Sequence, residues 1–319
     1  MSYWGGKKVL ITGGAGFLGS HLARALMSQG ASVTLVSHME SRPPLLAEGA
    51  GDYAFQVADI ADFEAVAEVL DKQRPETVFH TAARSIVGEA NLNPRPAFET
   101  NIKGAWNVLE ACRQSPFVQK LVVSSSDKAY GETDRLPYLE TTPLCGSHPY
   151  DVSKSCADLL AQTYFNTYGL PVCITRCGNY FGPGDPHLGR IFPGAIRSVL
   201  AGEAPVIRSD GQSVRDYLYI KDGAAAHLLL AEKMDDPAIH GQAFNFSNGR
   251  PMSVLEVIKS ILKEMNREDL SPIVLGQAAN EIKAQYLSSE KAAAILGWGP
   301  KYSFAQALRE TVAWYSGKN

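Results

Sequence analysis

The chain has 319 residues, of which 45% are hydrophobic and 20% charged, and this ordinary composition predicts a globular protein with one large domain or two that share a cleft. Its formal net charge of −3 shows no basic excess, so neither nucleic acid nor an anionic membrane is expected as a partner. No run of about 18 apolar residues is present, which argues against a transmembrane helix.

Short apolar runs alternate with longer amphipathic stretches through the first 180 residues. The apolar runs predict strands at residues 8–12, 32–37, 53–59, 77–83, 120–126 and 172–179. The amphipathic stretches predict helices near residues 17–29, 62–73, 97–114 and 149–168. This alternation predicts an α/β fold, in which helices cover both faces of a doubly wound parallel sheet.

The regular alternation of predicted strands and helices stops after residue 179. There the loop "YFGPGDPHLG" is followed by helices and short strands in irregular order. We therefore expect one domain over residues 1–178 and a smaller α/β substrate-binding domain over residues 179–319. A strand near residues 242–248 is a candidate to return to the first domain. Because ligands of open α/β sheets bind beyond the carboxyl ends of the strands, the second domain is expected to cap that edge.

Three glycines follow the first predicted strand directly and open the first predicted helix. In "ITGGAGFLGSHLARAL" they are Gly13, Gly16 and Gly19. Small residues at these positions let the chain turn tightly and let a pyrophosphate approach the helix N-terminus. A glycine pattern alone is weak, but its place at the start of a strand–helix unit favours dinucleotide binding over a plain turn.

The end of the second predicted strand does not show the acidic residue typical of NAD binding. The segment "TLVSHMESR" instead offers Ser37, His38, Glu40 and Arg42. Ser37 with Arg42 can hold the 2′-phosphate of NADP, whereas Glu40 can reach the ribose of NAD. A solvated loop is the plain alternative, and both cofactors stay open at this point.

Tyr150 and Lys154 are four residues apart in "HPYDVSKSCADLL", so on a helix they share one face. A phenol has a pKa near 10 and is a poor base at neutral pH. A neighbouring ammonium and an oxidised nicotinamide would favour the phenolate and lower that pKa. The spacing arises often by chance, but together with the glycine turn it indicates a redox site.

These motifs together resemble the extended short-chain dehydrogenase/reductase family. The matching segments run in order along most of the chain: "TGGAGFLG" (12–19), "AD" (58–59) with Ile60, "HTAA" (80–83), "TNIKG" (100–104), "SSS" (124–126), "YDVSK" (150–154), "RCGNYFGPGD" (176–185) and "VRDYLYIKD" (214–222). The resemblance implies a Rossmann-type domain over residues 1–178, a tightly bound and recycled NAD or NADP, and a nucleotide-diphosphate sugar as substrate. It also implies that Tyr150 is the base and that Lys154 binds the nicotinamide ribose.

The resemblance further implies which residues line the two ligand sites. Ser124 to Ser126 would supply the hydroxyl beside Tyr150. The other cofactor-binding residues would be Gly13, Gly16, Phe17, Leu18, Ser37, His38, Arg42, Asp59, Ile60, Ala82, Ala83, Asn101 and Ser124. The substrate-binding residues would be Ser85, Ser126, Asn179, Arg190 and Arg215. Arginine forks suit a diphosphate, although surface pairing with nearby Asp residues is the alternative for both arginines.

A hydroxyl, a carboxyl and an amine end the strand segment "LVVSSSDKAYG" (121–131). In this family the sugar 4,6-dehydratases carry Thr-Asp-Glu there, and the CDP-glucose 4,6-dehydratases carry an Asp-Lys pair, which Ser126-Asp127-Lys128 resembles. Elimination of water across C5 and C6 needs an acid at the 6-hydroxyl and a base at C5. We assign Asp127 as that acid and Lys128 as that base; a solvated pair on a loop is the alternative.

Three functions remain open from the sequence. A nucleotide-sugar 4,6-dehydratase with a CDP-glucose-like substrate is favoured by the Asp127-Lys128 pair. A nucleotide-sugar 4-epimerase shares Tyr150 and Lys154 but needs no such pair, and a non-catalytic dinucleotide-binding regulator needs no base at all. Asp216-Tyr217 stands where the CDP-glucose enzymes carry Pro-Trp, so CDP, GDP, UDP and dTDP sugars all stay open.

The remaining features concern the setting of the protein. Five cysteines without a CxxC pair predict buried, reduced thiols, no metal site and a cytoplasmic enzyme, and the opening segment leaves no room for a signal peptide.

The helices near 97–114 and 149–168 carry apolar residues on more than one face, including Trp106, Val108, Leu159 and Phe165. Family members pair these two helices, so a homodimer is expected.

Overall fold

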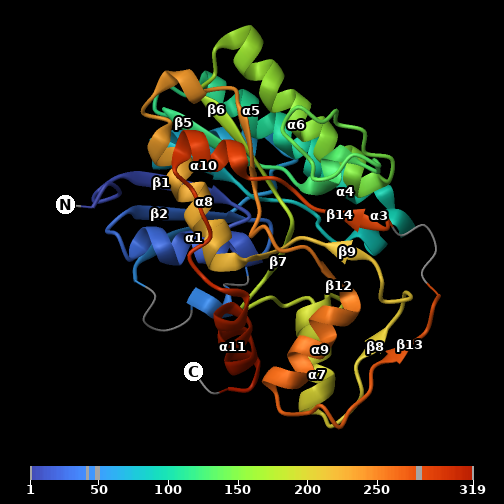
Figure 1. Ribbon diagram of the computed structural model, residues 1–319. Coiled ribbons are helices and arrows are strands. Elements are labelled where there is room, and N and C mark those ends of the chain that lie inside the picture. The colour runs from blue at the N-terminus through green and yellow to red at the C-terminus, as the bar shows by residue number, and fades with distance from the viewer. Residues whose placement is uncertain (1, 41–42, 47–50, 278–281, 318–319) are drawn as a thin grey trace.

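The computed structural model describes residues 2–40, 43–46, 51–277 and 282–317. Its centre is a seven-stranded sheet in the order β11-β6-β5-β4-β1-β2-β3, in which every pairing is parallel (Figure 1). The strands are β1 (Lys8–Thr12), β2 (Ser32–Ser37), β3 (Tyr53–Val57), β4 (Thr77–His80), β5 (Lys120–Ser124), β6 (Val172–Cys177) and β11 (Ala243–Phe246). The strand order reverses between β1 and β4, which confirms the predicted doubly wound, Rossmann-type α/β fold.

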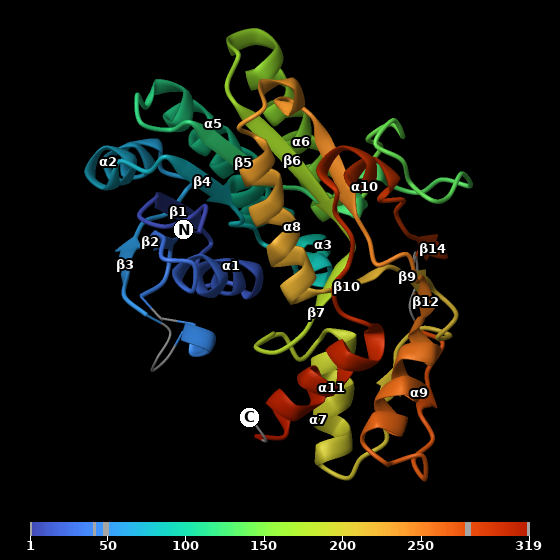
Figure 2. The same cartoon turned by 60° about the vertical axis from the view of Figure 1, so that its left-hand side comes forward.

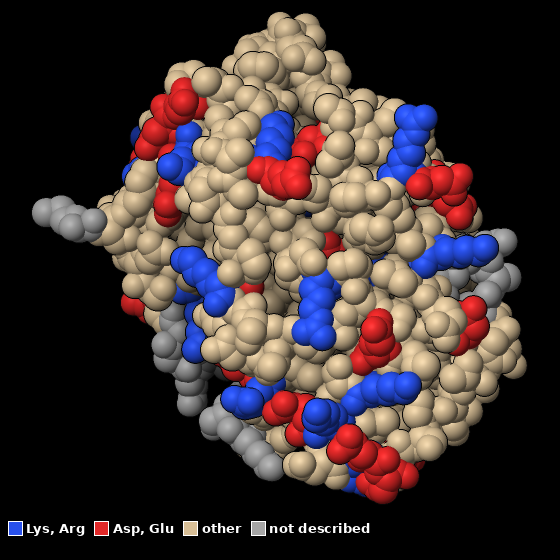
Figure 3. Space-filling model, viewed as in Figure 1, with Lys and Arg blue, Asp and Glu red and all other residues tan. Residues whose placement is uncertain are grey.

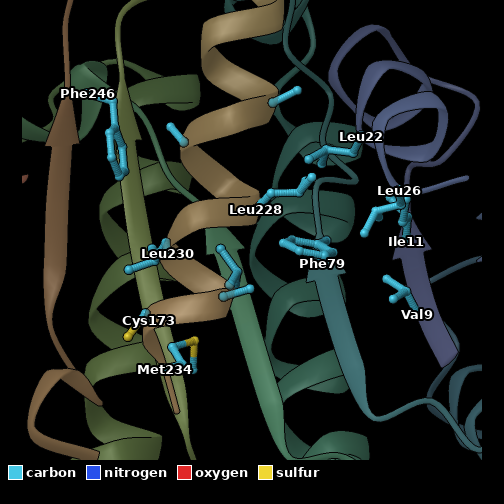
Figure 4. Close-up of a cluster of buried hydrophobic side chains, with 14 of the residues drawn as sticks. Val9, Ile11, Leu22, Leu26, Phe79, Cys173, Leu228, Leu230, Met234 and Phe246 are labelled. Atoms are coloured by element: carbon cyan, nitrogen blue, oxygen red, sulfur yellow. The ribbon is translucent and has the colours of Figure 1, made fainter. Parts of the chain in front are cut away.

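Helices cover both faces of this sheet. They are α1 (Phe17–Met27) and α8 (Ile220–Lys233) on one face, and α2 (Phe63–Gln73), α5 (Gly104–Gln114) and α6 (Pro149–Tyr168) on the other. Figure 4 shows Leu22 and Leu26 of α1 and Leu228 of α8 packed over Ile11 and Phe79 of the sheet. Burying each such side chain contributes roughly 1.5–3 kcal/mol, and the apolar composition of both faces of the strands follows from this.

Four of the predicted strands end earlier than the sequence indicates. The structure ends them at Val57, His80, Ser124 and Cys177, because the ladder to the neighbouring strand stops there. The residues that follow turn away as loops at the carboxyl edge of the sheet. This edge carries most of the polar residues singled out in the sequence.

The helix predicted over residues 97–114 is divided in three. It consists of α4 (Pro94–Phe98), a π-helical turn (Glu99–Lys103) and α5, and a short helix, α3 (Val87–Leu92), precedes them. The helix predicted over 149–168 matches α6 at both ends: Pro149 occupies its first turn, and Gly169 ends it with a left-handed φ of 68°. Of the four apolar residues expected at a dimer face, Val108 is buried in the monomer core and Phe165 packs against that core, whereas Trp106 and Leu159 are exposed.

The part after residue 178 forms a second apolar cluster below the sheet (Figure 2). Its helices are α7 (Ile191–Leu200), α9 (Val254–Glu264) and α11 (Phe304–Tyr315), with α10 (Glu290–Leu296) lying against β11 instead. Its small sheets pair β7 (Asn179–Phe181) with β10 (Tyr217–Tyr219), β8 (Val206–Ile207) with β13 (Ile273–Val274), and β9 (Val214–Arg215) with β12 (Met252–Ser253) and β14 (Ala284–Gln285). β11 pairs with β6, so this segment of the later chain lies in the central sheet; the domain boundary near residue 178 stays a prediction.

Charged side chains of both signs are interspersed over the face seen in Figure 3. On this face an anionic ligand would therefore be bound by particular side chains and backbone N–H groups. Within the described ranges, no helix combines the length and the apolar character needed to cross a bilayer.

Candidate functional site

The glycine turn between β1 and α1 is tight enough to require its glycines. Gly13 has a φ of +69°, and a Cβ there would lie 2.6 Å from Cα of Ala82. A Cβ on Gly19 would lie 2.3 Å from the carbonyl oxygen of Gly13. Gly16 is the N-cap of α1 and supplies no side-chain cap, which leaves the N–H groups of Phe17 and Leu18 directed at the turn. This geometry fits a dinucleotide pyrophosphate.

The residues expected at the adenosine end lie after β2 and β3. Ser37 is buried, and its hydroxyl accepts a hydrogen bond from the backbone N–H two residues further on, while His38 is exposed. Arg42 lies outside the described residues. Asp59 accepts a hydrogen bond from the backbone N–H of residue 61 at 2.9 Å, and Ile60 is buried. These positions surround the carboxyl ends of β2 and β3, beside the glycine turn.

Asn101 holds the loop that follows β4. Its amide exchanges two hydrogen bonds with the backbone of Arg84, at 2.8 and 3.1 Å, and donates a third to Ser153 of α6 at 2.9 Å. The loop carrying Ala82 and Ala83 is thereby tied to α6. Asn101 lies in the π-helical turn, a feature that is frequent at functional sites, and no sequence period revealed this turn.

Tyr150 and Lys154 lie on one face of α6 and both are buried. Nζ of Lys154 donates to the carbonyl oxygen of Ser124 at 2.8 Å, and burial lowers the pKa of this amine to about 8, against the opposing charge of Asp158. Burial raises the pKa of Tyr150 to about 12, and the cation that acts against this is Arg190. The Lys154 ammonium is turned to the end of β5, and its lowering of the phenol pKa together with an oxidised nicotinamide stays a prediction.

Ser126, Asp127 and Lys128 lie where β5 passes into a single 3₁₀ turn (Asp127–Tyr130). The Ser126 hydroxyl donates to Oδ1 of Asp127 at 3.0 Å and accepts from the N–H of Lys128 at 3.2 Å; it also acts to lower the pKa of Tyr150, against the effect of burial. Asp127 is only 1% exposed; burial raises its carboxyl pKa, and the Lys128 ammonium acts against this. Nζ of Lys128 donates to Oε1 of Gln285. The alternative of a solvated pair is wrong for Asp127.

Sequence reasoning missed His227, which reaches the site from α8. Its Nε2 lies 2.8 Å from Oγ of Ser124 and 2.9 Å from Oγ1 of Thr175, and its Nδ1 lies 2.8 Å from the carbonyl oxygen of Gly223. Burial lowers the pKa of His227 to about 4, so the ring is neutral. The Ser124 hydroxyl is thus held by His227, and Ser126 is the one of these serines that acts to lower the pKa of Tyr150.

A cavity of about 1020 Å³ opens between the sheet edge and the second part of the chain. The residues that line it include Lys128, Asp151, Asn179, Arg190 and Arg215. Arg190 bonds both Oγ of Ser85, at 2.9 Å, and the carboxylate of Asp185, at 3.1 Å. Three of the five residues expected at the substrate, Asn179, Arg190 and Arg215, therefore line this cavity, and a fourth, Ser85, accepts a hydrogen bond from Arg190.

Two acidic residues of this region were not predicted. Asp185 fixes Arg190, and Asp151 is 2% exposed with Oδ1 lacking a hydrogen-bond partner among the described residues. Asp151 directly follows Tyr150 in the quoted motif, so its position was visible in the sequence, although its burial was not. The described part of the chain holds no cluster of three or more His, Cys, Asp or Glu residues arranged for a metal ion.

Comparison with known proteins now decides the family. The model of the NAD dependent epimerase/dehydratase family matches residues 9–246. The chain belongs to this family. A dTDP-glucose 4,6-dehydratase of Neisseria meningitidis serogroup B is 32% identical over 97% of this chain and 93% of its own length. Among solved structures, a UDP-glucose 4-epimerase of Thermotoga maritima with UDP-glucose has a TM-score of 0.89 at 29% identity, covering 97% of this chain and 98% of its own.

The family comprises enzymes that depend on NAD, which confirms the predicted dinucleotide cofactor. A dTDP-glucose 4,6-dehydratase of Bacillus anthracis, solved in complex with NAD, has a TM-score of 0.86 at 27% identity, covering 98% of this chain and 97% of its own. The predicted relationship to the nucleotide-sugar 4,6-dehydratases, which are lyases, is confirmed by these family members. The residue roles stay predictions.

Proposed function

We propose that the protein removes water from a nucleoside-diphosphate glucose across C5 and C6, after oxidation at C4, to give a 4-keto-6-deoxy sugar. The observation that supports this best is the cluster Ser126–Asp127–Lys128 beside a cavity whose lining includes Lys128, Arg190 and Arg215. The arginines suit a diphosphate, and Asp127 with Lys128 suits the reacting sugar.

Each side chain has a defined task in this proposal. NAD would be held at the glycine turn, by Gly13, Gly16 and the N–H groups of Phe17 and Leu18, and would supply the hydride chemistry that the reaction needs at C4 and C6. Tyr150 accepts the proton of the 4-hydroxyl, aided by the positive charge of Arg190, and Lys154 holds the nicotinamide ribose from the end of β5. Lys128, as the neutral amine, takes the C5 proton, which the neighbouring ketone makes acidic. Asp127, whose pKa burial raises, gives a proton to the departing 6-hydroxyl.

The proposal also concerns which nucleotide the sugar substrate carries. The Asp127-Lys128 pair resembles that of CDP-glucose 4,6-dehydratases and favours CDP-glucose, whereas the named dehydratase relatives act on dTDP-glucose. The cavity lining includes two arginines that fit the diphosphate, a group common to every candidate.

The test is to incubate the purified holoenzyme with CDP-, dTDP-, UDP- and GDP-glucose in deuterated water. We expect loss of one water from one of them, CDP-glucose first, with one solvent deuterium at C5 of the product. A product of unchanged mass with inversion at C4 would instead establish the 4-epimerase, the second candidate favoured by the likeness to the Thermotoga maritima enzyme. No reaction with any of the four would overturn both.

A further inference from the structure

Gln285 holds the amine of Lys128 from a part of the chain that lies beyond the sequence motifs. Its Oε1 accepts a hydrogen bond from Nζ of Lys128, and its side chain is 0% exposed. Lys128 itself lines the cavity together with Arg190 and Arg215. Because Gln285 is fully buried, any effect that it has on a ligand in this cavity passes through Lys128.

The pairing of β9 with β14 places Gln285 at this position. The two strands are parallel, with Gln285 opposite Arg215. The backbone N–H of Asp216 donates to the backbone carbonyl oxygen of Gln285 at 3.1 Å. Gln285 and Lys128 are 157 residues apart in the chain, so it is the fold that brings them together.

Tyr138 fixes the orientation of the Gln285 amide. The Tyr138 hydroxyl has one hydrogen, which it donates to the carbonyl oxygen of Gly131. Toward Gln285 it can therefore only accept, and Nε2 of Gln285 donates to it at 3.4 Å. The amide oxygen then faces Lys128. Tyr138 is 0% exposed and stacks on Tyr130 with ring centroids 4.8 Å apart, which holds this hydroxyl in place.

The charge of this partner matters because the proposed function, on which this inference rests, needs Lys128 as a neutral amine. The carboxyl groups of Asp127 and Asp151 interact electrostatically with Lys128, and a carboxylate favours the ammonium form. A further carboxylate against Nζ would hold the proton there, whereas an uncharged amide oxygen accepts from amine and ammonium alike. Asp216 and Tyr138 adjoin Gln285. The other charged or titratable residues of the cavity are His148, Arg190, Arg197, Glu203, Arg208 and Arg215.

We propose that Gln285 is the positioning residue of the base, which fixes Nζ of Lys128 at the cavity through an uncharged acceptor. An amine that donates one N–H to Oε1 keeps its lone pair for the proton on C5 of the sugar. As the C5–H bond breaks, the proton joins this lone pair, and the electron pair left on C5 is delocalised into the neighbouring ketone as an enolate. The ammonium so formed still donates to Oε1, so the contact is the same before and after the transfer.

The test compares Gln285→Glu, which is isosteric and adds a charge, with Gln285→Met, which removes the acceptor. The rate of dehydration by holoenzyme with its nucleotide sugar is measured from about pH 6 to about pH 10, a range that spans the titration of a perturbed lysine. We expect Q285E to reach half its maximal rate at a pH higher than wild type by about 1 to 3, so that below both midpoints it is about 10- to 1,000-fold slower. Q285M should lose about 10²-fold at every pH, the scale of a misplaced group, without a displacement to higher pH.

Oxidation at C4 is the internal control, because it does not involve Lys128. In a single turnover both variants should reduce the bound cofactor at the wild-type rate and bind the nucleotide sugar with wild-type affinity. Exchange of the C5 hydrogen with deuterium should fall together with dehydration. A loss of cofactor reduction and dehydration by one common factor overturns the proposal, and so does a pH profile of Q285E equal to that of wild type.

A titration without substrate separates failure of this proposal from failure of the proposed function. Spectra of holoenzyme labelled with ¹³C at Cε of lysine report the ionisation of each amine, and Lys128→Met identifies the Lys128 signal. Q285E should raise the pKa of Lys128 and leave that of Lys154, which bonds Ser124, unchanged. An unchanged Lys128 pKa overturns the contact with Gln285, whatever the substrate is. A Lys128 that responds in a wild type that dehydrates none of the sugars overturns the proposed function, and the role of Gln285 in catalysis with it.

Discussion

At Asp127, burial and the neighbouring ammonium of Lys128 act on one carboxyl group in opposite directions, and burial has the larger effect. A carboxyl whose pKa is raised can hold a proton near neutral pH and can act as an acid. The sequence placed this carboxyl next to Lys128 but gave no sign that a 3₁₀ turn buries it. Its place near Tyr150, which lies on α6, depends on two elements that are joined only by the fold.

The Asp127→Asn variant should separate oxidation from elimination. An amide cannot supply the proton, so we expect holoenzyme with substrate to accumulate reduced nicotinamide and to exchange the C5 hydrogen with deuterium. Product release should fall by about 10²- to 10⁴-fold. Absorbance of the reduced cofactor and mass spectrometry of the sugar measure the two steps. Lys128→Met is the matched control, expected to lose the C5 exchange as well; full turnover by D127N would contradict the role of Asp127.

Lys154 should make the stability of the fold depend on pH. Its pKa is about 8 in the folded chain and 10.5 when exposed, so between these values the unfolded chain holds a proton that the folded chain does not. Unfolding free energy should therefore rise as pH increases from about 8 to 10.5, by at most roughly 3 kcal/mol. Urea unfolding of wild type and Lys154→Met across this range measures the difference. Parallel curves for the two proteins would contradict it.

Among the elements, the long ones were the most predictable. α6 agrees with its predicted bounds because a proline at its start, a glycine at its end and an apolar stripe all mark it. The strands of two or three residues in the second part have too few residues to show a period, and no helix pattern marks the π-helical turn at Asn101. Much of the site lies on short loops and turns that show no sequence period. The side chains that hold these residues come from distant segments of the chain, as His227 does for Ser124.

A buried ion pair fastens α6 to β6, one turn after Lys154. Arg176 and Asp158 form two hydrogen bonds of 2.8 Å, and their side chains are 3% and 0% exposed. Removing one partner leaves a buried charge alone, so we expect Arg176→Met and Asp158→Asn each to lower the free energy of unfolding by about 3–5 kcal/mol. The double variant R176M/D158L should recover most of that loss. Urea unfolding measures all three, and single variants within about 1 kcal/mol of wild type would refute the role of the pair.

For the whole molecule, the fold follows from the order of its elements, because strand–helix alternation with short connections leaves few topologies besides a doubly wound sheet. Alternation does not give the place of β11 beside β6; the sequence indicated only that a strand near residues 242–248 was a candidate to return to the first domain. Through β11 and α8 the later chain packs against the central sheet. His227, which holds Ser124, reaches the site by this route.

The predicted homodimer is the last property that belongs to the whole molecule. Trp106 on α5 and Leu159 on α6 are 46% and 51% exposed on neighbouring helices, and burial of a large apolar side chain contributes roughly 1.5–3 kcal/mol. In a two-fold dimer each substitution acts twice, so Leu159→Arg should raise the dimer dissociation constant by about 100-fold or more. Sedimentation velocity over a concentration series measures this. The control is Ile273→Arg, which charges an apolar residue of similar exposure (50%) on β13 and should leave the dimer unchanged. A monomeric wild type, or equal effects of the two substitutions, would show that α5 and α6 do not form the interface.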